Sequence, residues 1–153
     1  MFTGLIETTG EVISFAPGAG AARLTIATGP LAGRLRIGDS VAVSGVCLTA
    51  LGIEPDAVPA RFTADLAAET IARTTLSRLG PGSLVNLELP TPSGSPLGGH
   101  VVQGHVDGTG TMTALDPVIP ESSPHFDKQT TDWTLRVRVP ENVRQWMVPK
   151  GSV

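Results

Sequence analysis

Apolar and polar residues alternate along several short stretches of this chain, which is the pattern of a strand with one buried face. In residues 133–139, apolar residues alternate with a threonine and two arginines, and we predict a half-buried strand there. Residues 85–89 alternate in the same way before a proline, which predicts a second strand. Residues 41–43 and 47–49 are also predicted strands, and the Ser-Gly pair between them is either a turn or a bulge. Short strands at such close spacing are typical of a small closed barrel.

Helical patterns are short and few. Residues 65–79 place apolar residues at helical spacing and stop at a Gly-Pro-Gly sequence, which predicts one helix. Residues 140–148 begin with a proline and a glutamate, both favourable in a first turn, and predict another. Residues 90–99, rich in proline, glycine and serine, are the expected linker. A second loop is expected at residues 116–132, which are polar and contain prolines.

The sequence also begins to repeat itself. Residues 4–10 and 104–110 share the pattern of a glycine, two residues, an acid, one residue, a threonine and a glycine. The period is too long for a solenoid unit and suits a duplicated domain. We therefore predict a first domain over residues 1–99 and a partial copy of it over residues 100–153.

Composition narrows the class of protein. The 153 residues are 41% apolar, which supports a packed core, while 18 glycines and 13 prolines exclude long helices. A net charge of −3 with just two lysines argues against a nucleic-acid surface. No apolar run reaches the length of a membrane span, and the first residues do not resemble a signal peptide. A single cysteine excludes an intrachain disulfide and fits a reducing compartment, so we expect a soluble, cytoplasmic protein.

Few residues suggest chemistry by themselves. Cys47 is either a small buried hydrophobe on a strand or a nucleophile or ligand contact in an activating environment. His100 and His105 are five residues apart, so in a strand they point to opposite faces and suit one metal ion poorly. Because no paired Cys or His spacing is present, we expect no metal site, and we expect His125 to be solvated. The acids in residues 65–70 are compatible with a plain helix start, which acids stabilise without a ligand.

Taken together, four segments resemble riboflavin synthase of the α-subunit type. They are the start Met1–Glu7, the run Gly38–Thr49 with Ser44 where asparagine is common, the run Phe62–Leu76, and the segment Gly98–Gly108. These motifs occur in the family's order and span nearly the whole chain, so the resemblance is specific.

The resemblance implies an all-β fold of tandem six-stranded Greek-key barrels with short helices, in which the second barrel is incomplete. Each barrel of the family binds one molecule of 6,7-dimethyl-8-ribityllumazine. The family transfers a four-carbon unit between two such molecules, which gives riboflavin and 5-amino-6-ribitylaminouracil and needs no metal or redox cofactor. Its sites are expected between the first barrel of one subunit and the second barrel of a neighbour, usually in a homotrimer.

The resemblance also assigns roles to residues. Positions implicated in catalysis match Phe2, Ser40, Cys47 and His105. Positions that contact the lumazine match Gly4, Leu5, Ile6, Cys47, Leu48, Thr49, Asp65, Leu66, Ala67, Ala68, Glu69, Thr70, Gly104, His105, Val106 and Lys150. The reaction removes a proton from the 7-methyl group of the lumazine, and backbone N–H groups at 47–49 could stabilise the anion. A hydroxyl, thiol or imidazole could move the proton or add to the ring, and short polar side chains suit the ribityl hydroxyls.

Members of the family continue beyond the position of Val153 with a second Ser-Leu-Thr strand, a second Glu-Thr helix and a carboxy-terminal helix. We therefore expect a truncated sequence whose second barrel is open and exposes apolar residues such as Trp133 and Leu135. Three hypotheses stay open: a riboflavin synthase, a lumazine- or flavin-binding protein without turnover, and an inactive fragment. In the last case residues 1–90 fold alone and pair with a second copy. The presence of Cys47 and His105 favours the enzyme.

Overall fold

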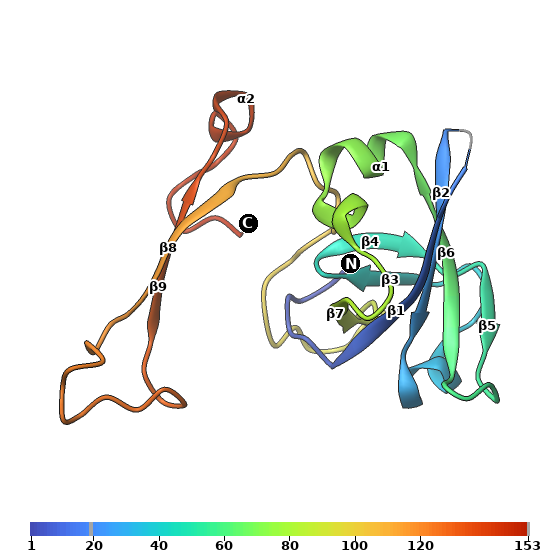
Figure 1. Ribbon diagram of the computed structural model, residues 1–153, viewed down its shortest axis with the longest axis horizontal. Helices are drawn as coiled ribbons and strands as arrows, with labels where there is room; N and C mark the ends of the chain where they lie inside the picture. The colour runs from blue at the N-terminus through green and yellow to red at the C-terminus, as the bar shows by residue number, and fades with distance from the viewer. Residues whose placement is uncertain (19, 153) are drawn as a thin grey trace. The chain divides into compact units, whose positions relative to one another are not determined.

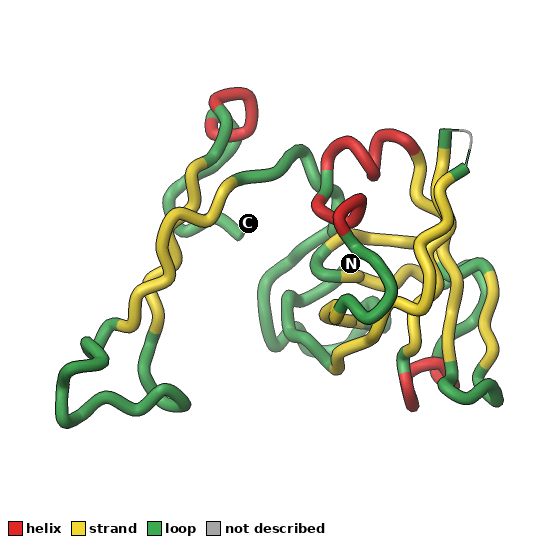
Figure 2. Tube along the Cα trace, viewed as in Figure 1, coloured by secondary structure: helices red, strands yellow, loops and turns green. Residues whose placement is uncertain are grey.

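The computed structural model describes residues 1–18 and 20–152, which fold into two compact units (Figure 1). Met1–Asp107 make up the first unit and Gly108–Gly151 the second. Both units are built from antiparallel strands with a few short helical turns (Figure 2). The predicted all-β class is therefore confirmed.

The first unit is one strongly curled antiparallel sheet of seven strands with three short helices. In chain order its elements are β1 (Thr8–Pro17), β2 (Ala21–Ala27), the 3₁₀ helix η1 (Gly29–Arg34), β3 (Ser40–Val43), β4 (Val46–Thr49), β5 (Gly52–Glu54), β6 (Arg61–Ala67), α1 (Ala68–Arg73), the 3₁₀ helix η2 (Thr75–Arg78) and β7 (Leu84–Glu88). The strands lie in the order β4-β3-β7-β1-β2-β6-β5, so β7 inserts between β3 and β1 although it comes last along the chain. The sheet has seven strands where six were expected, because the three residues of β5 form a strand of their own.

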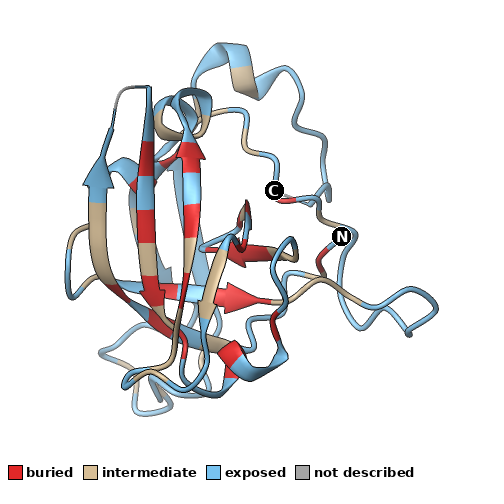
Figure 3. Cartoon of the chain, turned by 90° about the vertical axis from the view of Figure 1, so that its right-hand side faces the viewer, coloured by how far each residue is buried: buried red, intermediate tan, exposed pale blue. Residues whose placement is uncertain are grey.

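Buried and more exposed residues alternate along the strands (Figure 3). Every second residue therefore contributes its side chain to a common core. In β6 the buried residues are Phe62, Ala64 and Leu66, and the residues between them are more exposed. The strand predicted at residues 85–89 is β7, in which Val85 and Leu87 are buried. Full burial of a large apolar side chain stabilises a fold by about 1.5–3 kcal/mol. The core of the first unit is therefore the main source of its stability.

The Ser44-Gly45 pair between β3 and β4 is a two-residue hairpin turn and not a bulge. Both residues have positive φ, 46° at Ser44 and 83° at Gly45, and the strands pair directly on either side of them. Two positive φ values in a two-residue loop define a type I′ turn. Because the turn fixes the register of the hairpin, it places Cys47 opposite Ala42.

The helix predicted over residues 65–79 is wrong at its beginning. Asp65 and Leu66 belong to the end of β6, and α1 begins only at Ala68. The reason is the ladder between β2 and β6, whose consecutive residue pairs hold residues 61–67 in an extended strand. The helix then ends at Thr74, whose backbone is extended with φ −123° and ψ 168°, and η2 completes the segment.

The second unit is a hairpin followed by a short helix: β8 (Thr111–Pro117), β9 (Trp133–Arg138) and α2 (Glu141–Arg144). The strand predicted at 133–139 is present, and all six residues of β9 are exposed. The half-buried pattern is therefore wrong, whereas the expected exposure of apolar residues such as Trp133 and Leu135 in an open second barrel is confirmed. β8 extends into the predicted loop as far as Pro117, and α2 covers only part of the predicted helix. No helix in the part of the chain that the structure describes is long and apolar enough to cross a lipid bilayer.

The second unit repeats the local structure of β1 and β2. In the first hairpin Val12 pairs with Ile26, and the register shifts by a bulge before Ser14. In the second hairpin Met112 pairs with Val137, and the same shift occurs at the equivalent position of the repeat. The sequence repeat is thus visible in the pairing of the strands.

Candidate functional site

Two neighbouring strands of the first unit, β3 and β4, carry the candidate catalytic residues Ser40 and Cys47, and β7 lies next to β3. In the ladders, Cys47 of β4 lies opposite Ala42 of β3, which in turn lies opposite Glu88 of β7. Directly opposed residues of antiparallel strands point to the same face, and the valines and leucines on either side point into the core. These three residues therefore form one row on the face turned away from the core. Ser40 and Thr49 oppose each other on this face.

The amino-terminal residues are held at this row by Glu88. Its carboxylate accepts hydrogen bonds from the N–H of Thr3 at 2.6 Å, from Oγ1 of Thr3 at 2.7 Å and from the N–H of Gly4 at 3.1 Å. Only 4% of Glu88 is exposed, and three donors compensate the carboxylate for the water that it loses on burial. Phe2, the preceding residue, is 1% exposed and lies packed in the interior.

Residues 100–107, which we call the strap, pair with the amino-terminal segment. Phe2 and Val102 form an antiparallel bridge with N–H···O distances of 2.7 and 3.0 Å in the two directions. The N–H of His100 donates to the carbonyl of Thr3 at 2.9 Å. Since Phe2 and Val102 occupy equivalent positions of the sequence repeat, the two segments pair about a local two-fold axis.

The strap then reaches β4 at Cys47. The backbone N–H of Cys47 donates to the carbonyl oxygen of Gly104 at 2.8 Å. Gly104 has a φ of 76°, and a Cβ on it would lie 2.9 Å from both the Cβ and the backbone nitrogen of Cys47. The close approach of the strap to β4 therefore requires glycine at this position.

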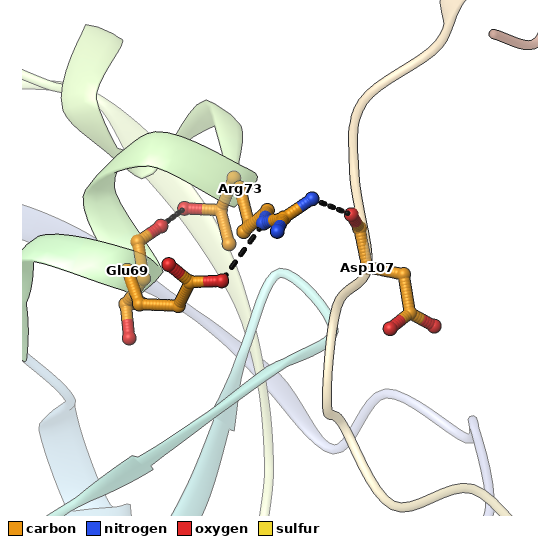
Figure 4. A network of polar contacts seen from close by, with 5 residues as sticks. Glu69, Arg73 and Asp107 are labelled. Atoms are coloured by element: carbon orange, nitrogen blue, oxygen red, sulfur yellow. Dashed lines mark hydrogen bonds and ion pairs between the residues drawn. The ribbon is translucent and has the colours of Figure 1, made fainter. Parts of the chain in front are cut away.

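The end of the strap is tied to α1 by Arg73 (Figure 4). Nη1 of Arg73 donates to the carbonyl oxygen of Asp107 at 3.2 Å, and its Nε donates to Oε1 of Glu69 at 2.9 Å. Between Gly104 and Asp107, His105 is exposed and Val106 packs against the core. His105 therefore lies between two residues whose carbonyls accept hydrogen bonds, Gly104 from Cys47 of β4 and Asp107 from Arg73 of α1.

The structure brings together three of the segments that the sequence singles out. They are residues 47–49 on β4, residues 104–106 on the strap, and the part of α1 that carries Glu69 and Thr70. Within β4, Cys47 is half-buried, Thr49 is exposed and Leu48 points into the core.

Asp65 is engaged elsewhere, by Arg23 of β2. The guanidinium donates two hydrogen bonds to the Asp65 carboxylate, Nε to Oδ1 at 2.7 Å and Nη2 to Oδ2 at 2.8 Å. These hydrogen bonds, reinforced by the charge of Arg23, lower the pKa of Asp65 from its ordinary value. The interpretation of Asp65 and Glu69 as acids of one helix start is wrong, because Asp65 lies on a strand. Of the residues between them, Leu66 is a core residue, whereas Ala67 and Ala68 are exposed.

The remaining candidate residues are Gly4, Leu5 and Ile6 of the amino-terminal segment and Lys150. Gly4, Leu5 and Ile6 are exposed, and Leu5 helps to line a different hollow of about 500 Å³ together with Glu7 and Arg34. Lys150 belongs to the second unit, where it is exposed and has a φ of 63°. In residues 1–18 and 20–152, no three His, Cys, Asp or Glu side chains gather as ligands of a metal ion would.

Two polar residues of this region, Glu88 and Arg73, are not predicted from the sequence to belong to the site. The alternation along β7 places Glu88 on the outer face of the strand, where an acid is expected to be solvated. Glu88 is buried instead because it binds Thr3, which lies 85 positions earlier in the chain. Arg73 follows Glu69 by four positions, a spacing that predicts the ion pair on a helix. Its contact with the strap has no local signal in the sequence.

The chain is similar to known lumazine-binding proteins. It matches the Lumazine binding domain family over residues 3–90. Over all of its 153 residues it is 44% identical to the riboflavin synthase of Mycobacterium tuberculosis (strain ATCC 25618 / H37Rv), of which it covers 69%. A structure of LumP complexed with 6,7-dimethyl-8-(1'-D-ribityl) lumazine is 26% identical, with a TM-score of 0.66 over 75% of this chain and 62% of that chain. A structure of LumP complexed with riboflavin shares the fold, with a TM-score of 0.75 over 97% of this chain and 72% of that chain at 22% identity. The family match and the identity to the mycobacterial enzyme together show that the chain belongs to the riboflavin synthase family.

Proposed function

We propose that this chain acts as a riboflavin synthase and that its first unit binds one molecule of 6,7-dimethyl-8-ribityllumazine. The reaction moves a four-carbon unit from one lumazine to another and yields riboflavin and 5-amino-6-ribitylaminouracil. The observation that carries the proposal is the strap, which ties β4 and α1 to the second repeat through the Cys47–Gly104 and Arg73–Asp107 hydrogen bonds. Candidate residues from three distant parts of the sequence are thereby joined within one folded unit.

In this proposal the lumazine ring lies against the outer face of β4, beside the strap. The N–H of Cys47 already donates to Gly104, so it points away from β3. Because the direction of N–H groups alternates along an antiparallel strand, the N–H of Thr49 also points away from β3. Thr49 therefore offers a fixed backbone donor for the anion that forms when the 7-methyl group loses its proton.

The side chains around this edge supply the remaining chemistry of the proposal. The imidazole of His105 takes the proton, or the Cys47 sulfur adds to the ring as a thiolate after its own proton has passed to a base such as His105. Ser40, opposite Thr49, is a further hydroxyl on the same face, and the buried Phe2 packs the segment that pairs with the strap. The hydroxyls of Thr49 and Thr70 suit the ribityl chain, which carries no phosphate.

The experiment that tests this activity is incubation of the full chain with the lumazine as sole substrate. We expect one riboflavin for every two lumazines consumed, without added metal or redox cofactor, and an unchanged rate in the presence of a chelator. Riboflavin is followed by its absorbance and fluorescence. A chain that is folded by circular dichroism and forms no riboflavin contradicts the proposed activity.

A second candidate function is lumazine or flavin binding without turnover. It is favoured by the structure of the second unit, which in the described residues consists of a hairpin and a short helix, whereas the first unit has seven strands. One barrel holds one lumazine, and the reaction consumes two. Retention of fluorescent lumazine without formation of riboflavin would decide for the binding function.

We further propose that the active form is a homotrimer in the cytoplasm, in which a neighbouring subunit brings the second lumazine. The single cysteine suits a reducing compartment. Light scattering of the purified chain with and without riboflavin measures its mass, and a monomer under turnover conditions would contradict the trimer.

A further inference from the structure

The strap has two attachments beside the candidate site, and they differ in kind. At Gly104 the attachment joins backbone atoms, because the N–H of Cys47 donates to the Gly104 carbonyl at 2.8 Å. At Asp107 it depends on one side chain, the guanidinium of Arg73, which donates to the backbone carbonyl at 3.2 Å. His105 and Val106 are the two residues between these points. Val106 packs against the core between these points, so the link between the end of the strap and α1 itself depends on a single side chain.

Helix α1 needs such an attachment because few of its residues hold it in place. It has six residues, none of them buried, and its N-cap residue Ala67 makes no side-chain capping hydrogen bond. Ile71 is the residue of α1 that packs partly against the core. A short element with little buried surface opens at low free-energy cost. The position of α1 therefore depends strongly on polar contacts at its ends, such as that of Arg73 with the strap.

The geometry of Arg73 suits this task. Its Nε donates to Oε1 of Glu69 at 2.9 Å while its Nη1 donates to Asp107, so Glu69 orients the guanidinium toward the strap (Figure 4). A planar guanidinium makes these two bonds from two different nitrogens in fixed directions, whereas the donors of a lysine all lie on one nitrogen. The side chains of Arg73 and Glu69 are 46% and 75% exposed, and exposed ion pairs contribute little to global stability. The contact therefore fixes a local position and adds little to the stability of the unit.

We propose that Arg73 is a positioning residue that sets the distance between α1 and the strap, and thereby places His105 and Thr70 for the ligand. This inference rests on the proposed function of the first unit as a lumazine-binding barrel. Arg73 itself is not assigned a contact with the ligand.

The test compares the Arg73→Gln, Arg73→Lys and Arg61→Gln variants of the full chain. Arg61 is the matched control, because it also forms a partly exposed ion pair, with Glu54, at the other end of β6. Riboflavin is the probe, and its dissociation constant is measured by quenching of its fluorescence. We expect about 5- to 20-fold weaker binding for Arg73→Gln, a smaller loss for Arg73→Lys and no change for Arg61→Gln. The urea midpoint of Arg73→Gln should match that of Arg61→Gln.

Hydrogen exchange separates the attachment from the binding of the ligand. Without ligand, the amides of residues 104–107 should exchange faster in Arg73→Gln than in the unaltered chain and in Arg61→Gln. Equal exchange in all three proteins overturns the proposal, as does a loss of riboflavin affinity that only follows a lowered urea midpoint. If the unaltered chain binds no riboflavin, the proposed function fails, and the exchange rates still decide whether Arg73 holds the strap.

Discussion

The two hairpins of this chain have the same pattern of pairing and different surroundings. β1–β2 and β8–β9 carry a bulge at equivalent positions, and each is followed by a short helix. In the first hairpin Leu24 and Ile26 are fully buried. Their counterparts in the second, Leu135 and Val137, are 57% and 45% exposed. The local sequence thus specifies the hairpin, whereas burial depends on strands that come later along the chain.

The neighbours of each hairpin explain the difference. In the first unit β7 pairs with the outer edge of β1 and β6 with the outer edge of β2, so that the hairpin lies inside a curled seven-stranded sheet whose core contains its apolar side chains. In the described part of the second unit, β8 and β9 form a two-stranded sheet by themselves. Two strands alone are marginally stable in water. Comparison of the two hairpins therefore separates the pairing of the strands, which the local sequence of each repeat specifies, from the burial of their side chains, which requires further strands.

The largest difference is expected from removing the same leucine in each hairpin. Leu24→Ala leaves a cavity in a closed core and should lower the free energy of unfolding by about 2–5 kcal/mol. Leu135→Ala removes an exposed side chain and should change it by less than about 0.5 kcal/mol. Urea unfolding followed by far-UV circular dichroism measures both.

A matched pair of variants checks that the size of the side chain is responsible. Leu24→Met, which keeps the volume, should recover most of the loss. If Leu135→Ala proves as costly as Leu24→Ala, the second hairpin is covered in solution and the comparison fails.

A second comparison uses the equivalent glycines Gly4 and Gly104. Both have positive φ, 82° and 76°, but a Cβ on Gly4 meets open space, whereas one on Gly104 meets Cys47 at 2.9 Å. Gly104→Ala should cost about 1–3 kcal/mol and weaken riboflavin binding, because it pushes the strap away from β4. Gly4→Ala should cost only the strain of its φ, about 1 kcal/mol. Thermal unfolding and riboflavin titration of both variants test this, and equal losses of affinity would contradict it.

The smallest expected effect concerns one ion pair in each unit, Arg23–Asp65 between β2 and β6 and Arg136–Asp116 between β9 and β8. The pKa of Asp65 is lowered by Arg23 in the folded chain. The pair therefore stabilises the fold above the unfolded pKa of an aspartate, about 4, and this stability is lost as the pH falls through the lower folded value. Arg23→Gln should lower the urea midpoint slightly at pH 7, and the difference should vanish in strong acid.

The counterpart is Arg136, which makes one hydrogen bond to Asp116 across the second hairpin. Because this hairpin carries no closed core, Arg136→Gln should leave the urea midpoint unchanged at both pH values. A deficit of Arg23→Gln that persists unchanged in acid would show that the arginine acts through packing rather than through Asp65.

Short-range patterns in the sequence predict the strands well. The alternation at 85–89 and 133–139 gives β7 and β9, and the Ser-Gly pair gives the turn of the β3–β4 hairpin. Patterns in the sequence fail to predict the structure of a segment when that structure depends on pairing with strands distant along the chain. Pairing with β2 holds Asp65 in a strand against its helical pattern, and β9 is exposed because in the described residues it pairs with β8 alone.

The candidate site follows the same rule. Residues 47–49 and 104–106 are recognisable as motifs, yet their contact depends on a hydrogen bond between segments from different repeats. The buried carboxylate of Glu88 and the guanidinium of Arg73 complete this arrangement through residues far along the chain. No local pattern in the sequence predicts that Glu88 binds Thr3 or that Arg73 binds Asp107, because these partners are brought together only when the chain folds.

The pairing of Phe2 with Val102 has a consequence for the history of such a protein. Because the strap belongs to the second repeat but completes the first unit, the boundary of the repeat and the boundary of the folded body are out of phase. An ancestor with a single repeat could have made the same contacts only by exchanging amino-terminal arms with another copy of itself. Duplication within one gene makes that exchange intramolecular, so that it no longer depends on how concentrated the protein is in the cell.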